Sequence, residues 1–314
     1  MRIAVIGAGV SGLTCGVRLM EEGARVTIVA REPPGETTSA VAGAVWFPYR
    51  VQPNDRTGPW GAAGYRRFEQ LARADAMPVT MVDVTILYGE RLAEDPWWIG
   101  SLPSHAVRET AELPEGYGDG RTARVPCIEA PAYLDWLARR FVELGGVVET
   151  RELDALDEPV ADVVVNCAGV GARELSGDHA IRPVRGQVAY VRTRERLRFM
   201  VDEDGPNALA YVLPRPDVVV LGGTAEEDDR EPRPRPETTK SILERTLLLE
   251  PRLASATYIG SAVGLRPARA EVRLEAEPLP DGRRLIHNYG HGGSGFTLSW
   301  GCADEVARLA LDAA

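Results

Sequence analysis

The chain has 314 residues, of which 44% are hydrophobic and 26% charged, and its formal net charge is −10. This length allows one large domain or two interleaved ones, and the negative charge argues against general binding to nucleic acids or anionic membranes. No run approaches the roughly 20 apolar residues of a membrane span. The apolar start, residues 1–10, lacks a basic region and a cleavage site, and the last residues carry no peroxisomal signal. We therefore expect a cytoplasmic protein.

Residues that bind metals or form covalent intermediates are few and scattered. The four cysteines and four histidines lack metal-ligand spacing, so no metal site is predicted. His287 and His291 are four residues apart, but the glycines around them argue against a shared helix. Lys240 is the only lysine and stands in a charged stretch, which argues against a Schiff-base enzyme.

The N-terminal segment predicts a strand–helix–strand unit. Residues 2–6 form a β-branched run, residues 13–22 a helix closed by Gly23, and residues 25–29 a second, parallel strand. The turn after the first strand carries a G-x-G-x-x-G pattern, whose glycines let backbone amides approach a pyrophosphate at a helix N-terminus. The predicted dinucleotide contacts are Gly7, Ala8, Gly9, Val10, Ser11 and Gly12.

The identity of the dinucleotide depends on the end of the second strand. An acidic residue that binds the ribose is expected about 20 residues after the last glycine, and Glu32 stands there. Arg31 precedes it, and an arginine at this place is compatible with a ribose phosphate and NADP. The alternatives for Arg31 are an exposed loop residue or a contact to the adenosine side. We include Arg31 and Glu32 among the candidate cofactor contacts.

The order of the predicted elements indicates an α/β fold with two domains threaded through each other. A third buried strand, residues 161–166, leads into Gly169, and a helix covers residues 299–311. Between these pieces lie a helix at 131–144, strands at 186–191, 210–213 and 218–221, a charged loop at 230–236 and a helix at 238–249. We expect a Rossmann-like nucleotide-binding domain formed by residues 1–46, 143–184 and 268–314. A substrate-binding α+β domain on a mostly antiparallel sheet would comprise residues 47–142 and 185–267.

Two further motifs contain residues suited to a ring or an anion. Residues 37–46 are small or carry hydroxyl groups, so their backbone can lie against a planar ring, although an ordinary loop of small residues is equally compatible. Arg266 stands between small and rigid residues in the string Gly264-Leu265-Arg266-Pro267, where its guanidinium is suited to bidentate capture of a carboxylate. An exposed arginine is the alternative, and Arg269 and Arg273 are weaker candidates.

A glycine-rich segment at residues 287–297 precedes the C-terminal helix. Its glycines bring backbone amides close to a ring or a phosphate, although a flexible loop would have the same composition. A second glycine-rich motif so far from the N-terminal one is unusual for a nicotinamide enzyme. It favours a flavin protein in which both ends of the chain surround one cofactor.

Taken together and in this order, the motifs resemble the D-amino-acid oxidase family. This family belongs to the flavin oxidases, which also include D-aspartate, glycine and sarcosine oxidases. The resemblance covers essentially the whole chain and is carried by residues 41–49 (VAGAVWFPY), 264–269 (GLRPAR) and 287–293 (HNYGHGG). The last string resembles the D-amino-acid and D-aspartate enzymes much more than the glycine and sarcosine enzymes.

The resemblance implies FAD as the cofactor and assigns three residues to catalysis. Arg266 would bind the substrate α-carboxylate, Tyr211 would donate its phenol to the same group, and the carbonyl of Gly293 would accept from the substrate amine. Further contacts to FAD are implied for Thr38, Ser39, Ala42, Gly43, Ala44, Gly169, Arg266, Gly292, Gly293, Ser294, Gly295, Phe296 and Thr297.

Two positions depart from the family's pattern. Mammalian members have a second tyrosine on a lid over the active site; here the corresponding position is Asn207, in a segment (residues 199–211) that is shorter. The pocket is therefore expected to be more open. In addition, the acid that binds the ribose is displaced: the family's pattern places it at position 31, which here is Arg31, and the acidic residue Glu32 follows.

The implied reaction is hydride transfer from the Cα of a neutral D-amino acid to flavin N5, which yields an oxo acid, ammonia and, with oxygen, hydrogen peroxide. The partners are thus a D-amino acid and molecular oxygen, with no nucleic acid and no membrane; a homodimer is one of the assemblies left open. D-aspartate oxidase is the nearest alternative and would need a second cation, for which Arg215 is a candidate. Glycine or sarcosine oxidase is a more distant alternative, and the last alternative is a protein that binds flavin without turnover.

Overall fold

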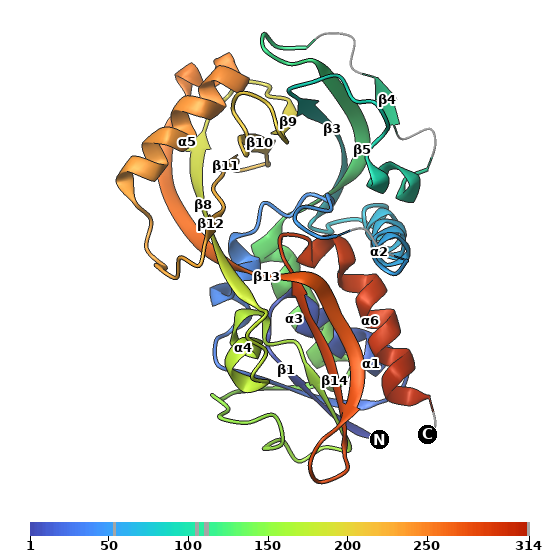
Figure 1. Ribbon diagram of the computed structural model, residues 1–314. Coiled ribbons are helices and arrows are strands. Elements are labelled where there is room, and N and C mark those ends of the chain that lie inside the picture. The colour runs from blue at the N-terminus through green and yellow to red at the C-terminus, as the bar shows by residue number, and fades with distance from the viewer. Residues whose placement is uncertain (53–54, 104–106, 110–112, 313–314) are drawn as a thin grey trace.

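All strands of the described chain belong to one mixed sheet (Figure 1). The computed structural model describes residues 1–52, 55–103, 107–109 and 113–312. The sheet has 14 strands in the order β4-β5-β3-β9-β10-β11-β8-β13-β14-β7-β1-β2-β6, and β12 pairs with β8. In this part of the chain no helix is long and apolar enough to cross a bilayer.

One half of the sheet is parallel and contains the predicted strand–helix–strand unit. Its strands are β14, β7, β1, β2 and β6, and each pairs in parallel with its neighbour. The β-branched residues of β1 and β7 are buried because both faces of a parallel sheet are covered. The bounds are β1 (Arg2–Ile6), β2 (Arg25–Ala30), β6 (Val147–Thr150), β7 (Val163–Asn166) and β14 (Arg284–His291).

Three helices cover one face of the parallel half: α1 (Val10–Glu21), α3 (Ala130–Glu143) and α6 (Gly295–Leu311). Gly16 brings α1 close to its neighbours, since a Cβ atom there would lie 2.9 Å from Ile28 and 3.1 Å from Phe141. The sequence placed the starts of α1 and α6 too late, at residues 13 and 299. Both first turns are rich in glycine and small residues, and such residues carry no apolar periodicity.

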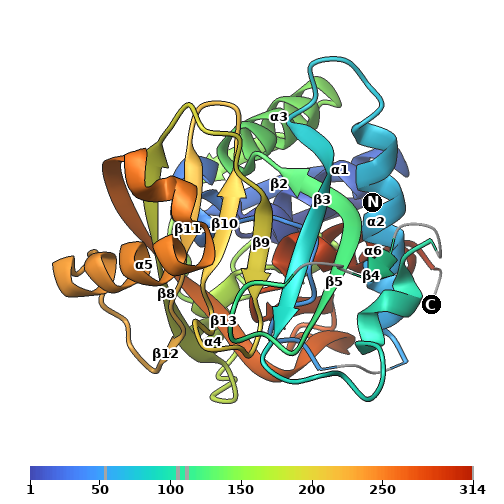
Figure 2. The same cartoon turned by 90° about the horizontal axis from the view of Figure 1, so that it is seen from above.

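The other half of the sheet is antiparallel except for the parallel pair β3 and β9. Figure 2 shows this half from above, with α5 on its outer side. Ile242 and Leu249 of α5 pack there with Ala189 and Leu221 of the sheet. The remaining elements are α2 (Thr57–Leu71), β3 (Val79–Tyr88), β4 (Val107–Glu109), β5 (Asp119–Ile128), α4 (Ala172–Leu175), β8 (Arg182–Arg192), β9 (Phe199–Asp202), β10 (Tyr211–Pro214), β11 (Val219–Gly222), β12 (Glu226–Glu227) and α5 (Pro236–Leu249).

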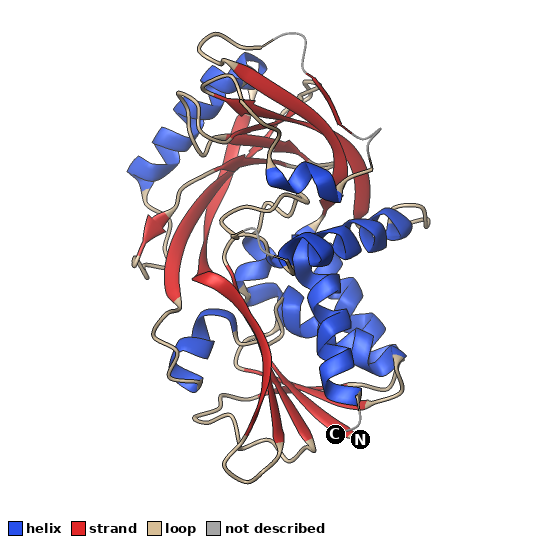
Figure 3. Ribbon diagram, turned by 45° about the vertical axis from the view of Figure 1, so that its right-hand side comes forward, coloured by secondary structure: helices blue, strands red, loops and turns tan. Residues whose placement is uncertain are grey.

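Strand β13 (Thr257–Pro278) joins the two halves (Figure 3). It pairs with β8 from Thr257 to Ala268, and with β14 through Ala268 and then from Arg273 onward, after a shift of register. The predicted fold class, a Rossmann-like half combined with a mostly antiparallel sheet, is confirmed. The alternative of a flexible loop does not hold for residues 287–291, because they complete β14 and only the turn at 292–294 separates them from α6.

Candidate cofactor and substrate site

A cavity of about 980 Å³ lies where the two halves of the sheet meet. This volume is at the upper end of the roughly 300–1,000 Å³ typical of small-molecule sites. Among the residues assigned to FAD or to catalysis, Gly12 and Ser294 do not line the cavity. The predicted residues that line it are Gly7, Ala8, Gly9, Val10, Ser11, Arg31, Glu32, Thr38, Ser39, Ala42, Gly43, Ala44, Gly169, Tyr211, Arg266, Gly292, Gly293, Gly295, Phe296 and Thr297.

The turn from β1 into α1 has the geometry of an anion site. Gly7 has a φ of +105°, and a Cβ atom there would lie 2.5 Å from the carbonyl oxygen of Cys167. A Cβ atom on Gly12 would overlap the carbonyl of Gly7, so the close packing of the first turn of α1 against the end of β1 requires glycine at position 12. The first N–H groups of α1 have no acceptor within the helix, and the helix dipole adds positive potential. Such a turn fits the pyrophosphate of a dinucleotide.

Carboxylates surround the end of β2. Glu32 lines the cavity and accepts hydrogen bonds from the Nε (3.1 Å) and Nη2 (2.8 Å) of Arg31, whose guanidinium also lies 3.7 Å from Glu152. The hydrogen bond and charge of Glu32 raise the pKa of Arg31. A ribose hydroxyl would find acceptors here, whereas a ribose phosphate would meet Glu32, Glu36 and Glu152. The arrangement therefore fits FAD better than NADP.

Two distant loops are tied to each other beside the turn. The Thr297 hydroxyl at the start of α6 donates to the Phe47 carbonyl (2.9 Å) and accepts from the Phe47 N–H (3.1 Å). The buried Ser294 hydroxyl donates to the Tyr49 carbonyl at 2.9 Å, so it supports the loop behind the cavity wall. Thr38 in turn bonds the backbone of Leu265 on β13. These bonds hold the segments at 37–49, 264–269 and 287–297 together beside the turn at 7–12, so all four sequence motifs meet at one cavity.

Arg266 projects from β13 into this cavity. Its Nη1 donates to the carbonyl of Thr224 at 2.8 Å, and its Cζ lies 5.6 Å from the ring centroid of Tyr49. The guanidinium lies over Gly186, where a Cβ atom would come within 2.5 Å of Cζ. Three other arginines line the cavity, and each pairs with a carboxylate: Arg31 with Glu32, Arg151 with Glu158 and Arg230 with Glu174. Arg266 has no ion-pair partner among the described residues.

The phenol of Tyr211 lines the cavity from β10. Its ring lies over Gly222, because a Cβ atom on that glycine would overlap the ring. Burial raises the pKa of Tyr211, and the nearby charge of Arg266 only partly opposes this. The phenol therefore stays protonated and can donate a hydrogen bond beside a guanidinium.

Tyr49 and Glu203 also line the cavity, and the sequence did not single them out. The carbonyl of Tyr49 accepts from the N–H of Gly293 at 3.2 Å, and a Cβ atom on Gly293 would overlap the Tyr49 ring. Tyr49 thus lies between Gly293 and Arg266. Its place at the end of the string at 41–49 was a usable signal. Glu203 follows the end of β9 and belongs to none of the sequence motifs, so no local signal pointed to it.

Several predicted candidates lie elsewhere. Arg215 donates to the carbonyls of Ile128 and Gly43 and pairs with Glu129 at 3.0 Å, and it does not line the cavity. Arg215 therefore supplies no second cation to the cavity. Asn207 does not line the cavity either; its side chain bonds the hydroxyl of Tyr117 at 3.3 Å and its N–H bonds the carboxylate of Asp202 at 2.9 Å.

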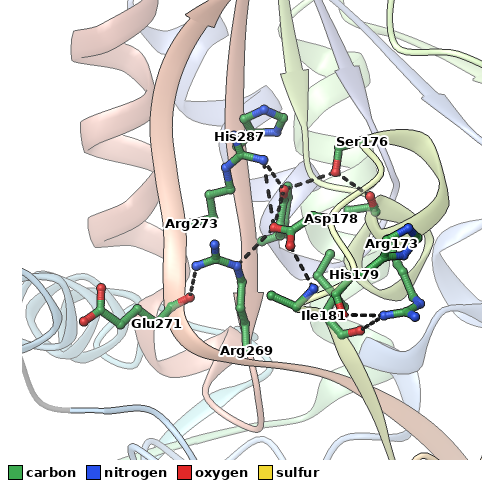
Figure 4. A network of polar contacts seen from close by, with 12 residues as sticks. Arg173, Ser176, Asp178, His179, Ile181, Arg269, Glu271, Arg273 and His287 are labelled. Carbon is green, nitrogen blue, oxygen red and sulfur yellow. Dashed lines mark hydrogen bonds and ion pairs between the residues drawn. The ribbon is translucent and has the colours of Figure 1, made fainter.

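Arg269 and Arg273 belong to a structural network instead of the cavity (Figure 4). Arg269 Nε lies 3.1 Å from Asp178, whose carboxylate also accepts from the hydroxyl of Tyr289 at 3.0 Å. Arg273 bonds the same hydroxyl at 2.8 Å and pairs with Glu275 at 2.6 Å. This network fastens β13 and β14 to the segment after α4.

The glycine-rich turn, the acidic strand end and the shared cavity define a dinucleotide-binding α/β protein. Over residues 2–309 the chain matches the profile of the family described as FAD dependent oxidoreductase. The chain therefore belongs to the FAD-dependent oxidoreductase family, and its cofactor is FAD.

Individual proteins within and beyond this family are similar to the chain over nearly its whole length. The chain is 46% identical to a D-amino-acid oxidase of Rubrobacter xylanophilus, over 98% of this chain and 95% of the relative. It is 38% identical to a D-aspartate oxidase of Homo sapiens, over 98% of this chain and 94% of the relative. The crystal structure of glycine oxidase from Geobacillus kaustophilus has a TM-score of 0.79 at 19% identity, covering 98% of this chain and 94% of that one, and it shares the fold.

Proposed function

We propose that this chain catalyses the oxidative deamination of neutral D-amino acids to oxo acids, ammonia and hydrogen peroxide. The observation that carries the proposal is that the guanidinium of Arg266 has no carboxylate partner in the part of the chain that the structure describes, whereas the other arginines that line the cavity are paired. A partly buried cation without a counter-ion is costly, and a substrate carboxylate would supply that counter-ion. The 46% identity to a protein named D-amino-acid oxidase gives independent support.

The proposed substrate contacts come from three elements. Arg266 on β13 binds the α-carboxylate, and the neutral phenol of Tyr211 on β10 donates to the same group. The carbonyl of Gly293, in the turn before α6, accepts from the amine. With the carboxylate and amine held, only one enantiomer directs its Cα–H toward the ring.

When bound, FAD would supply the acceptor for the hydride from Cα and, on reoxidation by oxygen, the electrons for hydrogen peroxide. The imino acid that the substrate becomes would then be hydrolysed by water to the oxo acid and ammonia. The residues of this chain orient the substrate, because Arg266 and Tyr211 hold its carboxylate and the carbonyl of Gly293 accepts a hydrogen bond from its amine. No side chain is assigned as a base, since transfer from a neutral amine needs none. The residues proposed to hold FAD are Gly7, Ala8, Gly9, Val10, Ser11, Gly12, Arg31, Glu32, Thr38, Ser39, Ala42, Gly43, Ala44, Gly169, Arg266, Gly292, Gly293, Ser294, Gly295, Phe296 and Thr297.

D-aspartate oxidase is the nearest alternative, because the relative from Homo sapiens carries that name. It would need a second free cation beside the substrate side chain. Arg215 is engaged by Glu129 and two carbonyls, and this engagement argues against that activity. Glycine or sarcosine oxidation and flavin binding without turnover are further alternatives. A free carboxylate clamp has no use in a protein that only binds flavin.

Peroxide release tests the proposal. The FAD-loaded protein is incubated with the D- and L-forms of alanine, proline and aspartate and with glycine. Peroxide from the neutral D-amino acids is expected. Peroxide from D-aspartate alone or glycine alone would assign the activity to one of the alternatives, and peroxide from none of them would exclude an oxidase.

We also propose the division into a nucleotide-binding part (residues 1–46, 143–184 and 268–314) and a substrate-binding part (residues 47–142 and 185–267). A cytoplasmic location is supported by the four free, buried cysteines. A homodimer stays a prediction, which sedimentation analysis would test.

A further inference from the structure

A buried arginine that does not line the cavity holds part of the cavity wall. Arg215 directly follows β10, its side chain is 3% exposed, and its guanidinium pairs with Glu129 at 3.0 Å. The same guanidinium donates to the carbonyls of Ile128 and Gly43. Gly43 lines the cavity, whereas Arg215 does not. Arg215 thus lies behind the wall and holds it through the backbone.

The contact to Gly43 determines the direction of a backbone donor. Among the described residues the cis peptide bond lies between Gly222 and Gly223, so the bond between Gly43 and Ala44 is trans. In a trans peptide the carbonyl and the following N–H point in opposite directions. Because the Gly43 carbonyl points to Arg215 behind the wall, the Ala44 N–H points toward the cavity, which Ala44 also lines. This N–H has no acceptor among the described residues.

The backbone conformation of Ala44 is unfavourable on its own. Its φ is +46°, a left-handed conformation that residues with a side chain rarely adopt. Two contacts maintain it: the Ile128 N–H donates to the Ala44 carbonyl at 2.8 Å, and Arg215 holds the preceding carbonyl. Burial of the Arg215 charge adds a further cost, and its Nε has no acceptor in the described chain. Conformations that are costly and held in this way are frequent at ligand sites.

The part of FAD that lies beside Ala44 is expected to be its ring system. The Val10 N–H donates to the Ser39 hydroxyl at 3.0 Å, so one end of the segment 39–44 lies at the turn that fits the pyrophosphate. At the other end, a Cβ atom on Gly43 would lie 3.6 Å from the Tyr211 hydroxyl. The segment therefore extends from the phosphate turn toward the proposed substrate groups, beside which the reactive ring has to lie.

We propose that Arg215 is a positioning residue for the flavin, which directs the Ala44 N–H toward the ring system and strengthens it as a donor. The place of the ring beside Tyr211 rests on the proposed function. A hydrogen bond from a guanidinium is charge-assisted, and linked hydrogen bonds polarise one another, so the peptide between Gly43 and Ala44 becomes a stronger donor. Reduced flavin carries more negative charge than oxidised flavin, so this donor favours the reduced form and raises the reduction potential.

The reduction potential of the bound FAD tests the proposal and requires no amino acid. It is measured in the FAD-loaded protein by reduction against a reference dye. In Arg215→Met the stability of the reduced form relative to the oxidised form should fall about tenfold, the size of one hydrogen bond, or about 30 mV for a two-electron couple. Arg215→Lys retains a cation behind the wall and should shift the potential less. An unchanged potential in Arg215→Met would overturn the proposal.

Arg283→Met is the matched control. Arg283 also pairs with a carboxylate and donates to backbone carbonyls, those of Asp157 and Pro159, but none of these residues lines the cavity. This variant should retain the native potential. An equal fall in both methionine variants would overturn the proposal, because a general loss of stability would then explain the effect.

Glu129→Gln provides a test that does not depend on the folding of Arg215→Met. The amide retains an acceptor for Arg215 but removes the charge that partly neutralises it, so the potential should rise. A fall or an unchanged potential would contradict the proposal. The expected shifts in a protein that releases no peroxide from any D-amino acid would support the role of Arg215 and remove the proposed function. Peroxide release with the same potential in all variants would do the reverse.

Discussion

The guanidinium of Arg266 lies over the backbone of Gly186. The two residues are on adjacent strands, where Gly264 of β13 pairs with Gly186 of β8. A Cβ atom at position 186 would come within 2.5 Å of the Arg266 Cζ. Glycine at this position thus gives the guanidinium the space it occupies in the cavity wall. The position of the Arg266 guanidinium, on which the proposed function rests, therefore requires that residue 186 has no side chain.

Gly186→Ala is therefore expected to displace Arg266 without unfolding the protein, because the guanidinium is the free end of a flexible side chain. A shift of about 1 Å at a substrate-binding group reduces activity by about 100-fold. Steady-state kinetics with D-alanine should show this loss in kcat/KM at unchanged flavin content. Gly58→Ala on α2 is the matched control, since no atom lies within 4 Å of its Cβ position. Normal kinetics in Gly186→Ala would contradict the assignment.

Arg266→Ala should lower kcat/KM for D-alanine by roughly 100-fold, or about 3 kcal/mol, because the substrate carboxylate loses its charged partner. FAD should stay bound, which the visible spectrum would report. Arg269→Ala serves as control, because Arg269 pairs with Asp178 outside the cavity. If the two variants had the same KM, Arg266 would not be the carboxylate ligand.

Gly12→Ala should weaken FAD binding by about tenfold or more. The added methyl group overlaps the Gly7 carbonyl, so the turn before α1 must shift, and overpacking of this kind costs about 1–3 kcal/mol. The measurement is the flavin-to-protein ratio after gel filtration at fixed FAD concentration. Gly35→Ala, with open space at its Cβ position, should retain the native ratio. Full flavin retention in Gly12→Ala would show that the turn does not hold the cofactor.

Asp178 is expected to make stability depend on pH. Burial alone would raise the pKa of Asp178, but hydrogen bonds from Ala180 and Tyr289 and the charge of Arg269 outweigh it and lower the pKa. A depressed folded-state pKa stabilises the protein above the unfolded value of about 3.9, and the contribution is lost as pH falls through the folded value.

Asp178→Asn should accordingly lower the free energy of unfolding at pH 7 by about 1–3 kcal/mol. Urea titrations at neutral pH and below about pH 4 should show the difference narrowing in acid. Glu244→Gln, which removes an exposed pair with Lys240, should be nearly neutral. A difference that persists unchanged in acid would mean that the Asp178 carboxylate charge is not the cause.

The sequence by itself was sufficient for features that depend on local backbone conformation. The glycines at 7, 9 and 12 between a β-branched run and a helix predicted the dinucleotide turn, because only a few residues are involved in it. Alternating and buried runs located β8, β10 and β11. Helix starts were less accurate, since a glycine-rich first turn has no periodic signal.

Only the tertiary structure decided which charged residues are free. The sequence favoured Arg266 over Arg269 and left Arg215 as a candidate second cation, but it could not show that Glu129 engages Arg215 and Asp178 engages Arg269 from distant segments. Glu203 follows the end of β9, and only the folded arrangement of this half of the sheet brings it to the cavity wall. Such pairings form between residues far apart in the chain, so the tertiary structure alone determines them.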